Sequence, residues 1–196
     1  SSSIDPSGGV FYPDSFEKHF SFNDLIHKGA LTGIRVEGPT NSVDQRIKRL
    51  SKELDLLENE YSVLNVEQSN IFWKKTKNLE VFSNTEKNLL RVVVPVSETL
   101  NFLQKLKNVD LSYFLDWGGS LIWLELNDIS IKILNEIKDI TKDHNGYFTI
   151  IKVEEDMKAS ADIFTIDPIK YKISEKIKKS FDPKRIFNPG KMYTGI

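Results

Sequence analysis

The stretch LSYFLDWGGSLIWLEL, residues 111–126, decides the fold that this sequence predicts. Two apolar runs, 111–117 and 120–126, flank the pair Gly118-Gly119. A glycine pair between apolar runs is typical of a β-hairpin, because glycine readily adopts the positive φ angles that tight turns require. The stretch therefore predicts two neighbouring antiparallel strands.

Helices and strands alternate on both sides of this hairpin. The run NLLRVVVPV, residues 88–96, predicts a strand that Pro95 ends, and Ser97 can cap the helix that follows. After the hairpin, the sequence predicts a helix over 129–142, stopped by Asn145-Gly146, and a strand in YFTIIKV. The residues expected to face inward are Leu100, Leu103 and Leu106 in the first helix, and Ile129, Ile133, Ile137 and Ile140 in the second.

The segment before residue 88 is less regular. GALTGIRVEG, residues 29–38, has the alternation of a strand, and apolar residues over 43–57 predict an amphipathic helix capped by Asn41 or Ser42. YSVLNVEQ, residues 61–68, predicts a short strand. We expect residues 154–168 to form a polar loop, followed by a basic helix over 168–181 that buries Ile169, Ile173 and Ile177.

This order of elements predicts an α+β sandwich of the ferredoxin-like or split βαβ type, with a mainly antiparallel sheet and helices on one face. We expect three parts: a linker over 1–28, the α+β domain over 29–168, and a C-terminal helix and tail over 169–196.

Composition excludes several kinds of site. The 196 residues are 39% hydrophobic and contain no cysteine, so disulfides and thiol chemistry are absent. The three histidines show neither HxH nor HxxxH spacing, and we expect no metal site. Lys and Arg total 27 against 28 Asp and Glu, which does not favour nucleic-acid binding, and no long apolar run predicts a transmembrane segment. Residues 170–191 alone carry eight basic and two acidic residues.

The common motifs for nucleotide binding, nucleophilic serine and zinc hydrolysis do not occur, which leaves single residues as candidates. Arg91 interrupts an apolar strand and could bind a carboxylate or phosphate, but a solvent-facing position explains it better from the residues alone. Asp116 and Trp117 at the glycine turn could approach a ligand, although such a turn is more often only structural. His144 fits the end of a helix better than the role of a general base.

The tail KSFDPKRIFNPGKMYTGI, residues 179–196, has two proline turns. Pro189 forces an extended backbone at Asn188, and Gly190 permits the reversal before Lys191. The amide of Asn188 could pair with a group that offers a donor beside an acceptor, such as the pyrimidine edge of a flavin. A structural loop anchored by apolar side chains explains the tail equally well. Those side chains are Phe181, Ile186, Phe187 and Tyr193.

FDPKRIFNPGKMY resembles the C-terminal motif of FAD-linked oxidases of the vanillyl-alcohol oxidase type. With IRVEG, FW, LLRVVVP and LDWGGSLIWL in that order, residues 7–193 resemble the C-terminal half of the FAD-binding subunits of glycolate oxidase. The resemblance implies an α+β cap domain that closes over a flavin, while a separate N-terminal domain holds most of the FAD.

The resemblance also implies roles for particular residues. Asn188 and Lys191 would contact the cofactor, and Arg91 would bind the carboxylate of a small 2-hydroxy acid in a pocket walled by Trp117 and Tyr147. Relatives commonly have Gly-Gly-His-Ala-Thr where this chain has Asn-Gly-Tyr-Phe-Thr over 145–149, so Tyr147 stands in the place of the histidine. The HxH metal motifs of some relatives are absent.

The function implied is the substrate side of an FAD-dependent 2-hydroxy-acid oxidoreductase acting on glycolate or a close analogue. Its partners would be the flavin-binding domain and other oxidase subunits, including an electron-transfer subunit. We expect a cytoplasmic location, either free or peripheral at the inner membrane through those subunits. The alternative is a non-catalytic ferredoxin-like module that docks a subunit or senses a ligand.

Overall fold

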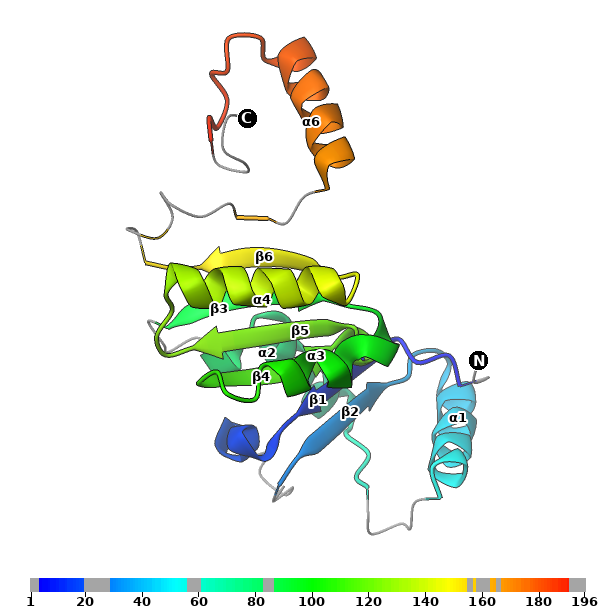
Figure 1. Cartoon of the computed structure of the whole chain (residues 1–196). Helices are drawn as coiled ribbons and strands as arrows, with labels where there is room; N and C mark the ends of the chain where they lie inside the picture. The colour runs from blue at the N-terminus through cyan, green and yellow to red at the C-terminus, as the bar shows by residue number, and fades with distance from the viewer. Residues whose placement is uncertain are drawn as a thin grey trace. The chain divides into compact units, whose positions relative to one another are not determined.

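The computed structural model describes residues 4–19, 29–55, 61–82, 87–154, 157, 163–164 and 167–190, without the side chains of 17–19. Six strands form one antiparallel sheet in the order β2-β1-β4-β5-β3-β6, accompanied by α-helices (Figure 1). This arrangement confirms the predicted α+β class and the mainly antiparallel sheet. The strands are β1 (Gly8–Tyr12), β2 (Leu31–Arg35), β3 (Asn88–Val93), β4 (Leu111–Asp116), β5 (Leu121–Leu126) and β6 (Tyr147–Lys152). The α-helices are α1 (Thr40–Glu53), α2 (Val66–Lys77), α3 (Thr99–Lys105), α4 (Ile131–Asp143) and α6 (Pro168–Phe181).

The middle of the chain follows the order β3, α3, β4, β5, α4, β6. Within the sheet, these strands lie in the spatial order β4-β5-β3-β6. A β-α-β-β-α-β sequence of this kind is the ferredoxin-like motif. The glycine pair at the predicted hairpin falls in a short 3-10 turn, Trp117–Gly119, between β4 and β5.

The chain divides into two compact units. The first contains Ser1–Glu86 and Tyr113–Gly119, and the second contains Lys87–Ser112 and Ser120–Ile196. Because the stretch around the hairpin turn belongs to the first unit, the chain enters that unit twice.

In the first unit, β1 pairs antiparallel with β2, from Gly8 opposite Arg35 to Tyr12 opposite Leu31. The prediction of a linker over 1–28 is therefore wrong for β1; residues 20–28 lie outside the described residues. The reason is packing, since Val10 and Tyr12 alternate into the core although the strand opens with two glycines.

An aromatic cluster forms the core of the first unit. The ring of Tyr12 stacks on Phe114 with centroids 4.8 Å apart, and Phe16 meets Phe82 edge to face at 5.7 Å. The buried hydroxyl of Tyr12 donates a hydrogen bond to Thr76 Oγ1 at 3.0 Å, which ties β1 to α2. Aromatic pairs of this geometry stabilise a core beyond the area that they bury.

Two helices of the first unit differ from prediction in how they begin. The strand predicted over 61–68 is wrong, because Asn65 and Gln68 form a reciprocal capping box that starts α2. The helix predicted over 43–57 is confirmed in part as α1, which ends at Glu53 with Leu54 as its C-cap and has no buried residue. Residue 57 lies outside the described residues. The helix begins after Pro39 and not with a side-chain cap from Asn41 or Ser42.

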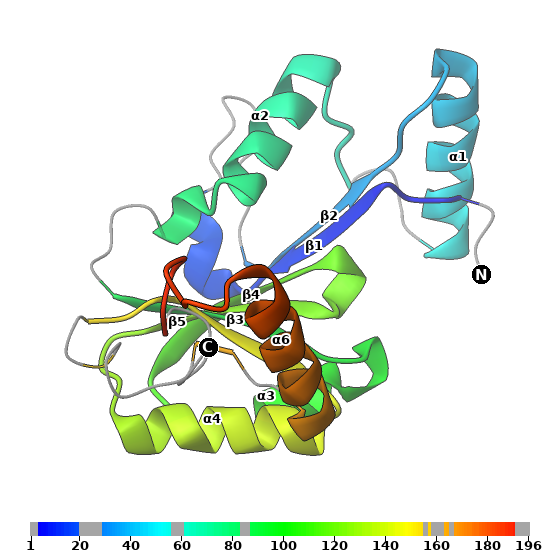
Figure 2. The ribbon, with the colours of Figure 1, turned by 90° about the horizontal axis from the view of Figure 1, so that it is seen from above.

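In the second unit, alternate residues of three strands make one apolar face. Leu90 lies opposite Leu124 and Ile150, and Val92 lies opposite Ile122 and Phe148. Both ribbon views place α3 and α4 on the same side of these strands (Figure 2). The strands predicted over 88–96 and 147–153 are therefore confirmed, and their inward residues form the core of this unit.

The inward faces of α3 and α4 are shifted from the predicted ones. In α3 Phe102 is buried, as is Leu106 at the C-cap, whereas Leu100 is 70% exposed, so its predicted burial is wrong. The reason is that α3 begins at Thr99, and the face that meets the sheet passes through residues 99, 102 and 106. In α4 the buried residues are Leu134, Ile137 and Thr141.

The end of α4 confirms the predicted stop. His144 is the C-cap and Asn145 has φ 54°, a left-handed conformation that terminates helices. His144 Nδ1 lies 2.8 Å from the carbonyl oxygen of Ile140, and its ring meets Phe102 edge to face. Its role is structural, as its position in the sequence suggested.

The helix α6 has the bounds predicted for it, with Asp167 as N-cap and Pro168 in the first turn. The predicted burial of Ile169, Ile173 and Ile177 is wrong, since all three are exposed. A periodic stripe shows which side of a helix is apolar, but it does not show that another element covers that side. Across the described residues, no helix is long and apolar enough to cross a bilayer.

Candidate functional site

Arg91 lies in the middle of β3, on the face opposite the core of the second unit. Its neighbours in the chain, Leu90 and Val92, point to the core, so Arg91 points to the other face. The register places Trp123 of β5 directly opposite Arg91 on one side and Thr149 of β6 opposite it on the other. Arg91 is half-buried there, beside an indole and a hydroxyl.

Tyr147 shares this face with Arg91. It begins β6 opposite Val93, two residues before Thr149, so Arg91 and Tyr147 are diagonal neighbours on one face of the β3–β6 ladder. Diagonal neighbours lie about 7 Å apart, within reach of long side chains. The structure therefore brings two of the predicted substrate residues together.

A lysine of α6 contacts Tyr147. The ammonium of Lys170 lies 4.6 Å from the centroid of the ring and donates a hydrogen bond to the hydroxyl at 3.1 Å. Tyr147 is nevertheless 56% exposed, so the ring keeps a surface on which a ligand could bind. No sequence pattern pointed to Lys170, because it lies 23 residues away from Tyr147.

Trp117 belongs to the first unit. It has φ 51°, a left-handed conformation that is rare for a bulky residue, and it is 59% exposed. Its backbone amide donates to Asp116 Oδ1 at 2.7 Å, and Gly118 continues the turn with φ 64°. The carboxylate of Asp116 thus holds the turn that presents the indole.

Burial controls the ionisation of two groups in this unit. Burial raises the pKa of Asp116, and the hydrogen bond from Trp117 partly opposes that shift. Burial also raises the pKa of Tyr12 well above its usual range, so its hydroxyl stays protonated and can donate to Thr76.

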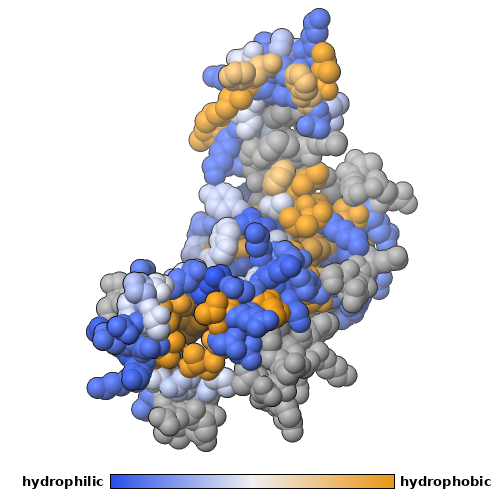
Figure 3. Space-filling model, turned by 180° about the vertical axis from the view of Figure 1, so that it is seen from behind, coloured by the Kyte–Doolittle hydropathy of each residue, from blue (hydrophilic) through white to orange (hydrophobic). Residues whose placement is uncertain are grey.

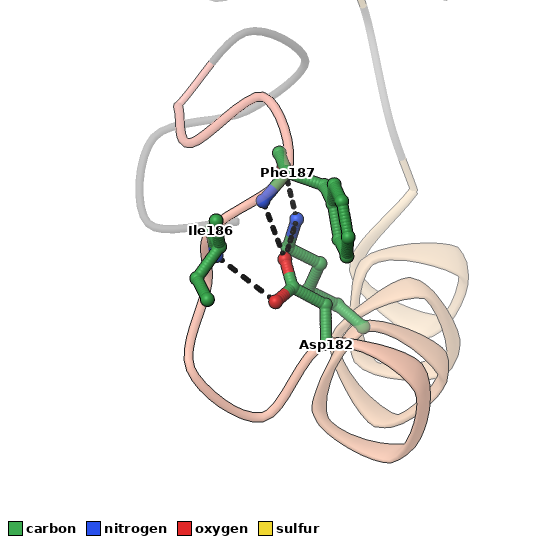
Figure 4. A network of polar contacts seen from close by, with 4 residues as sticks. Asp182, Ile186 and Phe187 are labelled. Carbon is green, nitrogen blue, oxygen red and sulfur yellow. Dashed lines mark hydrogen bonds and ion pairs between the residues drawn. The ribbon is translucent and has the colours of Figure 1, made fainter.

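The tail after α6 folds around one carboxylate, that of Asp182 (Figure 4). Its Oδ1 accepts from the amide of Ile186 and its Oδ2 from the amide of Phe187, both at 2.9 Å. Lys178, one turn earlier in α6, pairs with Oδ2 at 2.7 Å and also donates to the carbonyl oxygen of Phe187. These contacts bend residues 182–187 into a loop that we call the hook.

The electrostatics of the hook follow from these partners. The hydrogen bond from Lys178, with help from the two amides, lowers the pKa of Asp182 to about 2 even though its burial opposes the shift. The carboxylate is therefore ionised at any physiological pH. Sequence reasoning missed Asp182, although its spacing of four residues from Lys178 on a helix was a usable signal.

Asn188 follows the hook directly. It is exposed and has φ 47°, and Gly190 has φ 69°. The extended backbone expected at Asn188 is therefore wrong. Asn tolerates the left-handed region better than most residues, which allows this conformation before Pro189. Lys191 lies outside the described residues.

The apolar residues expected to anchor the tail do not do so among the described residues. Phe181 is 85% exposed, and Ile186 and Phe187 are exposed as well. Apolar surface on α6 and the residues after it is visible in Figure 3. The ion pair with Lys178 and the hydrogen bonds to backbone amides hold the hook in place, and its apolar side chains stay exposed, where they can contact another surface.

A single exposed amide on a fixed loop suits one edge contact to a flavin ring. One such contact cannot enclose a dinucleotide, which needs a larger concave surface. Among the described residues, no group of three or more His, Cys, Asp or Glu side chains lies close enough together to hold a metal ion.

Comparison of the chain with models of protein families, and with curated proteins, found no match in either case.

Proposed function

We propose that this chain is the substrate-side cap domain of an FAD-dependent 2-hydroxy-acid oxidoreductase, with glycolate or a close analogue as substrate. The observation that carries the proposal is the placement of Arg91 and Tyr147, from different strands, as neighbours on one face of the sheet. A guanidinium beside a phenol on a surface of this kind suits a small acid that bears a hydroxyl group.

In this proposal Arg91 binds the substrate carboxylate. Its planar guanidinium can donate two parallel hydrogen bonds to a carboxylate, which fixes orientation as well as affinity. Trp123, directly opposite Arg91, provides an apolar wall on one side. Tyr147 can then hydrogen-bond the substrate hydroxyl, while Lys170 orients the phenol through the contact at its oxygen. Trp117, which belongs to the first unit, stays a predicted substrate residue.

A bound flavin would supply the redox chemistry by accepting a hydride equivalent from the carbon that carries the hydroxyl group. The residues of this chain would orient the substrate and bind one edge of the ring. Asn188 is the candidate for that edge contact, with Lys191 as a neighbouring cation. The hook around Asp182 supports this role because it fixes the backbone immediately before Asn188.

The remaining expectations concern partners. Most of the FAD would be held by a separate flavin-binding domain, and electrons would pass on through other oxidase subunits. We propose a cytoplasmic location for such an assembly.

A non-catalytic docking or ligand-sensing module is the second candidate. The exposed apolar side chains of α6 favour it, because a helix that serves only to dock a partner needs such a surface and needs no active site. The two candidates differ in whether a flavin accompanies the chain.

The test is to purify the tagged chain from its own cells together with its natural partners. We expect the complex to contain stoichiometric flavin, released by acid and measured by fluorescence, and to reduce a dye when glycolate is added. Arg91→Lys keeps the positive charge but cannot donate the two parallel hydrogen bonds of a guanidinium, so the variant should retain only a small part of the glycolate-dependent rate. Arg49→Gln, which removes an exposed arginine paired with Glu53, is the matched control and should keep it.

Flavin without any oxidation of hydroxy acids, or a complex that lacks flavin, would refute the proposal. The second outcome would favour the docking module. Flavin retention by Asn188→Ala equal to that of the unmodified chain would remove Asn188 from the cofactor contact.

A further inference from the structure

We propose that α6 is an in-plane anchor for an anionic phospholipid surface. Its apolar stripe consists of Ile169, Ile173, Ile177 and Phe181, all exposed. At about 100° per residue, these side chains span roughly 120° of the helix circumference. A stripe of that width is typical of helices that lie in the interface of a membrane.

The charged residues of α6 are arranged to suit such a surface. Lys172, Lys176 and Lys179, which we call the border lysines, lie about 80–140° from the centre of the stripe on one side, and their long stems can extend toward lipid headgroups. Lys170 lies within the arc of the stripe, about 40° from its centre, and its ammonium contacts Tyr147. Glu175 lies about 180° from the centre of the stripe, so the acidic side chain points away from it. Residues 168–185 carry seven Lys or Arg against two acidic residues, which complements a negatively charged leaflet.

The stripe also faces a different direction from the hook. Lys178, which holds the hook, lies about 120° around the helix from the centre of the stripe, and its side chain is only 16% exposed. The half-buried side of α6 carries Tyr171, Ser174 and Lys178, whereas the apolar stripe is exposed. Lipid binding by the stripe therefore leaves Asn188 available, and the inference does not rest on the proposed flavin contact.

A lipid surface suits this helix better than a protein groove. A groove requires a matching shape and acidic groups at fixed places, whereas a bilayer accepts any apolar stripe with a basic border. Ile169 lies in the first turn and Phe181 is the last residue of the helix, so the stripe runs the whole length of α6. We expect α6 to lie flat on the surface, and an acidic protein partner is the competing occupant.

The experiment measures co-sedimentation of the full chain with vesicles of phosphatidylcholine alone and of phosphatidylcholine mixed with phosphatidylglycerol. We expect binding to the mixed vesicles only, with affinity that falls as salt is raised. Changing the three border lysines to glutamine together should lower the partition coefficient by about a hundredfold.

A substitution in the stripe gives the sharper test. Ile173→Asp should lower binding at least tenfold, by roughly the cost of placing a carboxylate where an alkyl group entered the interface. Leu100→Asp is the matched control, because Leu100 is as exposed as Ile169 but lies on α3, and it should bind as the unmodified chain does. Ile169→Asp is a second stripe variant that should keep α6 folded, since an acidic residue in the first turn favours a helix. Circular dichroism checks the fold of each variant.

Equal binding to neutral vesicles, no binding to mixed vesicles, or an equal loss in Leu100→Asp would overturn the inference. The stripe would be assigned to an acidic partner protein instead if the chain forms a complex of fixed stoichiometry with that protein, Ile173→Asp abolishes the complex, and the chain does not bind vesicles.

Discussion

Gly146→Ala should destabilise the protein far more than an alanine substitution at an exposed glycine. A Cβ atom at Gly146 would lie 2.7 Å from the carbonyl oxygen of Val93, 2.7 Å from Val94 Cγ1 and 2.8 Å from Thr141 Cγ2. The carbonyl belongs to the backbone of a central strand and cannot rotate away. Only a shift of the α4–β6 connection can relieve the contact.

The loss in the free energy of unfolding can be estimated from the known effects of overpacking a core. Inserting a methyl group into a filled site costs typically 1–3 kcal/mol, and three close contacts place this variant at about 3 kcal/mol. For a chain of this length, that corresponds to a fall in Tm of roughly 6–12 °C. The shift should also displace Tyr147, the next residue, from its place beside Arg91.

Gly190→Ala is the matched control. Gly190 has φ 69°, and a Cβ atom added there would have no heavy atom of the described residues within 4 Å, so alanine meets only the conformational penalty of about 1 kcal/mol. Urea denaturation followed by circular dichroism measures both variants. A loss for Gly146→Ala no larger than that for Gly190→Ala would show that the connection has room, and the reasoning would fail.

Three further predictions concern ionisable groups. If Arg91 binds the substrate carboxylate, Arg91→Gln should raise KM for glycolate by roughly 30- to 100-fold, measured by steady-state dye reduction in the intact complex. The pKa of Asp182 falls from 3.8 to about 2 on folding, so its stabilisation of the hook is complete above about pH 4 and is lost as the pH falls through 2. Hydrogen exchange at the amide of Phe187 should report that loss, and Asp182→Asn should speed the exchange already at neutral pH. Burial raises the pKa of Asp116, so the folded state disfavours its charged form. Asp116→Asn removes that charge and should therefore raise the urea concentration at the unfolding midpoint at pH 7. At a pH below the pKa of Asp116, where the carboxyl group is already neutral, the substitution should leave the midpoint unchanged.

Much of the fold could be predicted from the sequence because its strong patterns are local. The glycine pair at 118–119 and the apolar run in β3 carry their own turn and strand signals, and Asn145 marks the end of α4. The alternation of these elements was enough to predict the ferredoxin-like order. The strand β1 was missed because its identity depends on partners far along the chain, chiefly Thr76 and Phe114.

The candidate site was predictable only as separate residues. Arg91 stood out as a charge in an apolar strand, but its proximity to Tyr147 depends on the register of β3 with β6, which no local pattern fixes. The stripe on α6 shows what periodicity cannot predict. The helical spacing of its isoleucines was predicted correctly, but whether another element covers these side chains depends on tertiary contacts, about which the spacing carries no information.

Because Tyr113–Gly119 belongs to the first unit, that unit can complete its fold only after the ribosome has synthesised the chain as far as residue 119. A nascent chain that has emerged only as far as Glu86 lacks Phe114, so the ring of Tyr12 can make its edge contacts with Phe16 and Phe72 but not the stacked contact, and the core of the first unit stays incomplete. Truncation at residue 86 should accordingly yield an aggregation-prone fragment, and a chaperone that shields exposed aromatic side chains would act between the emergence of β1 and that of β4.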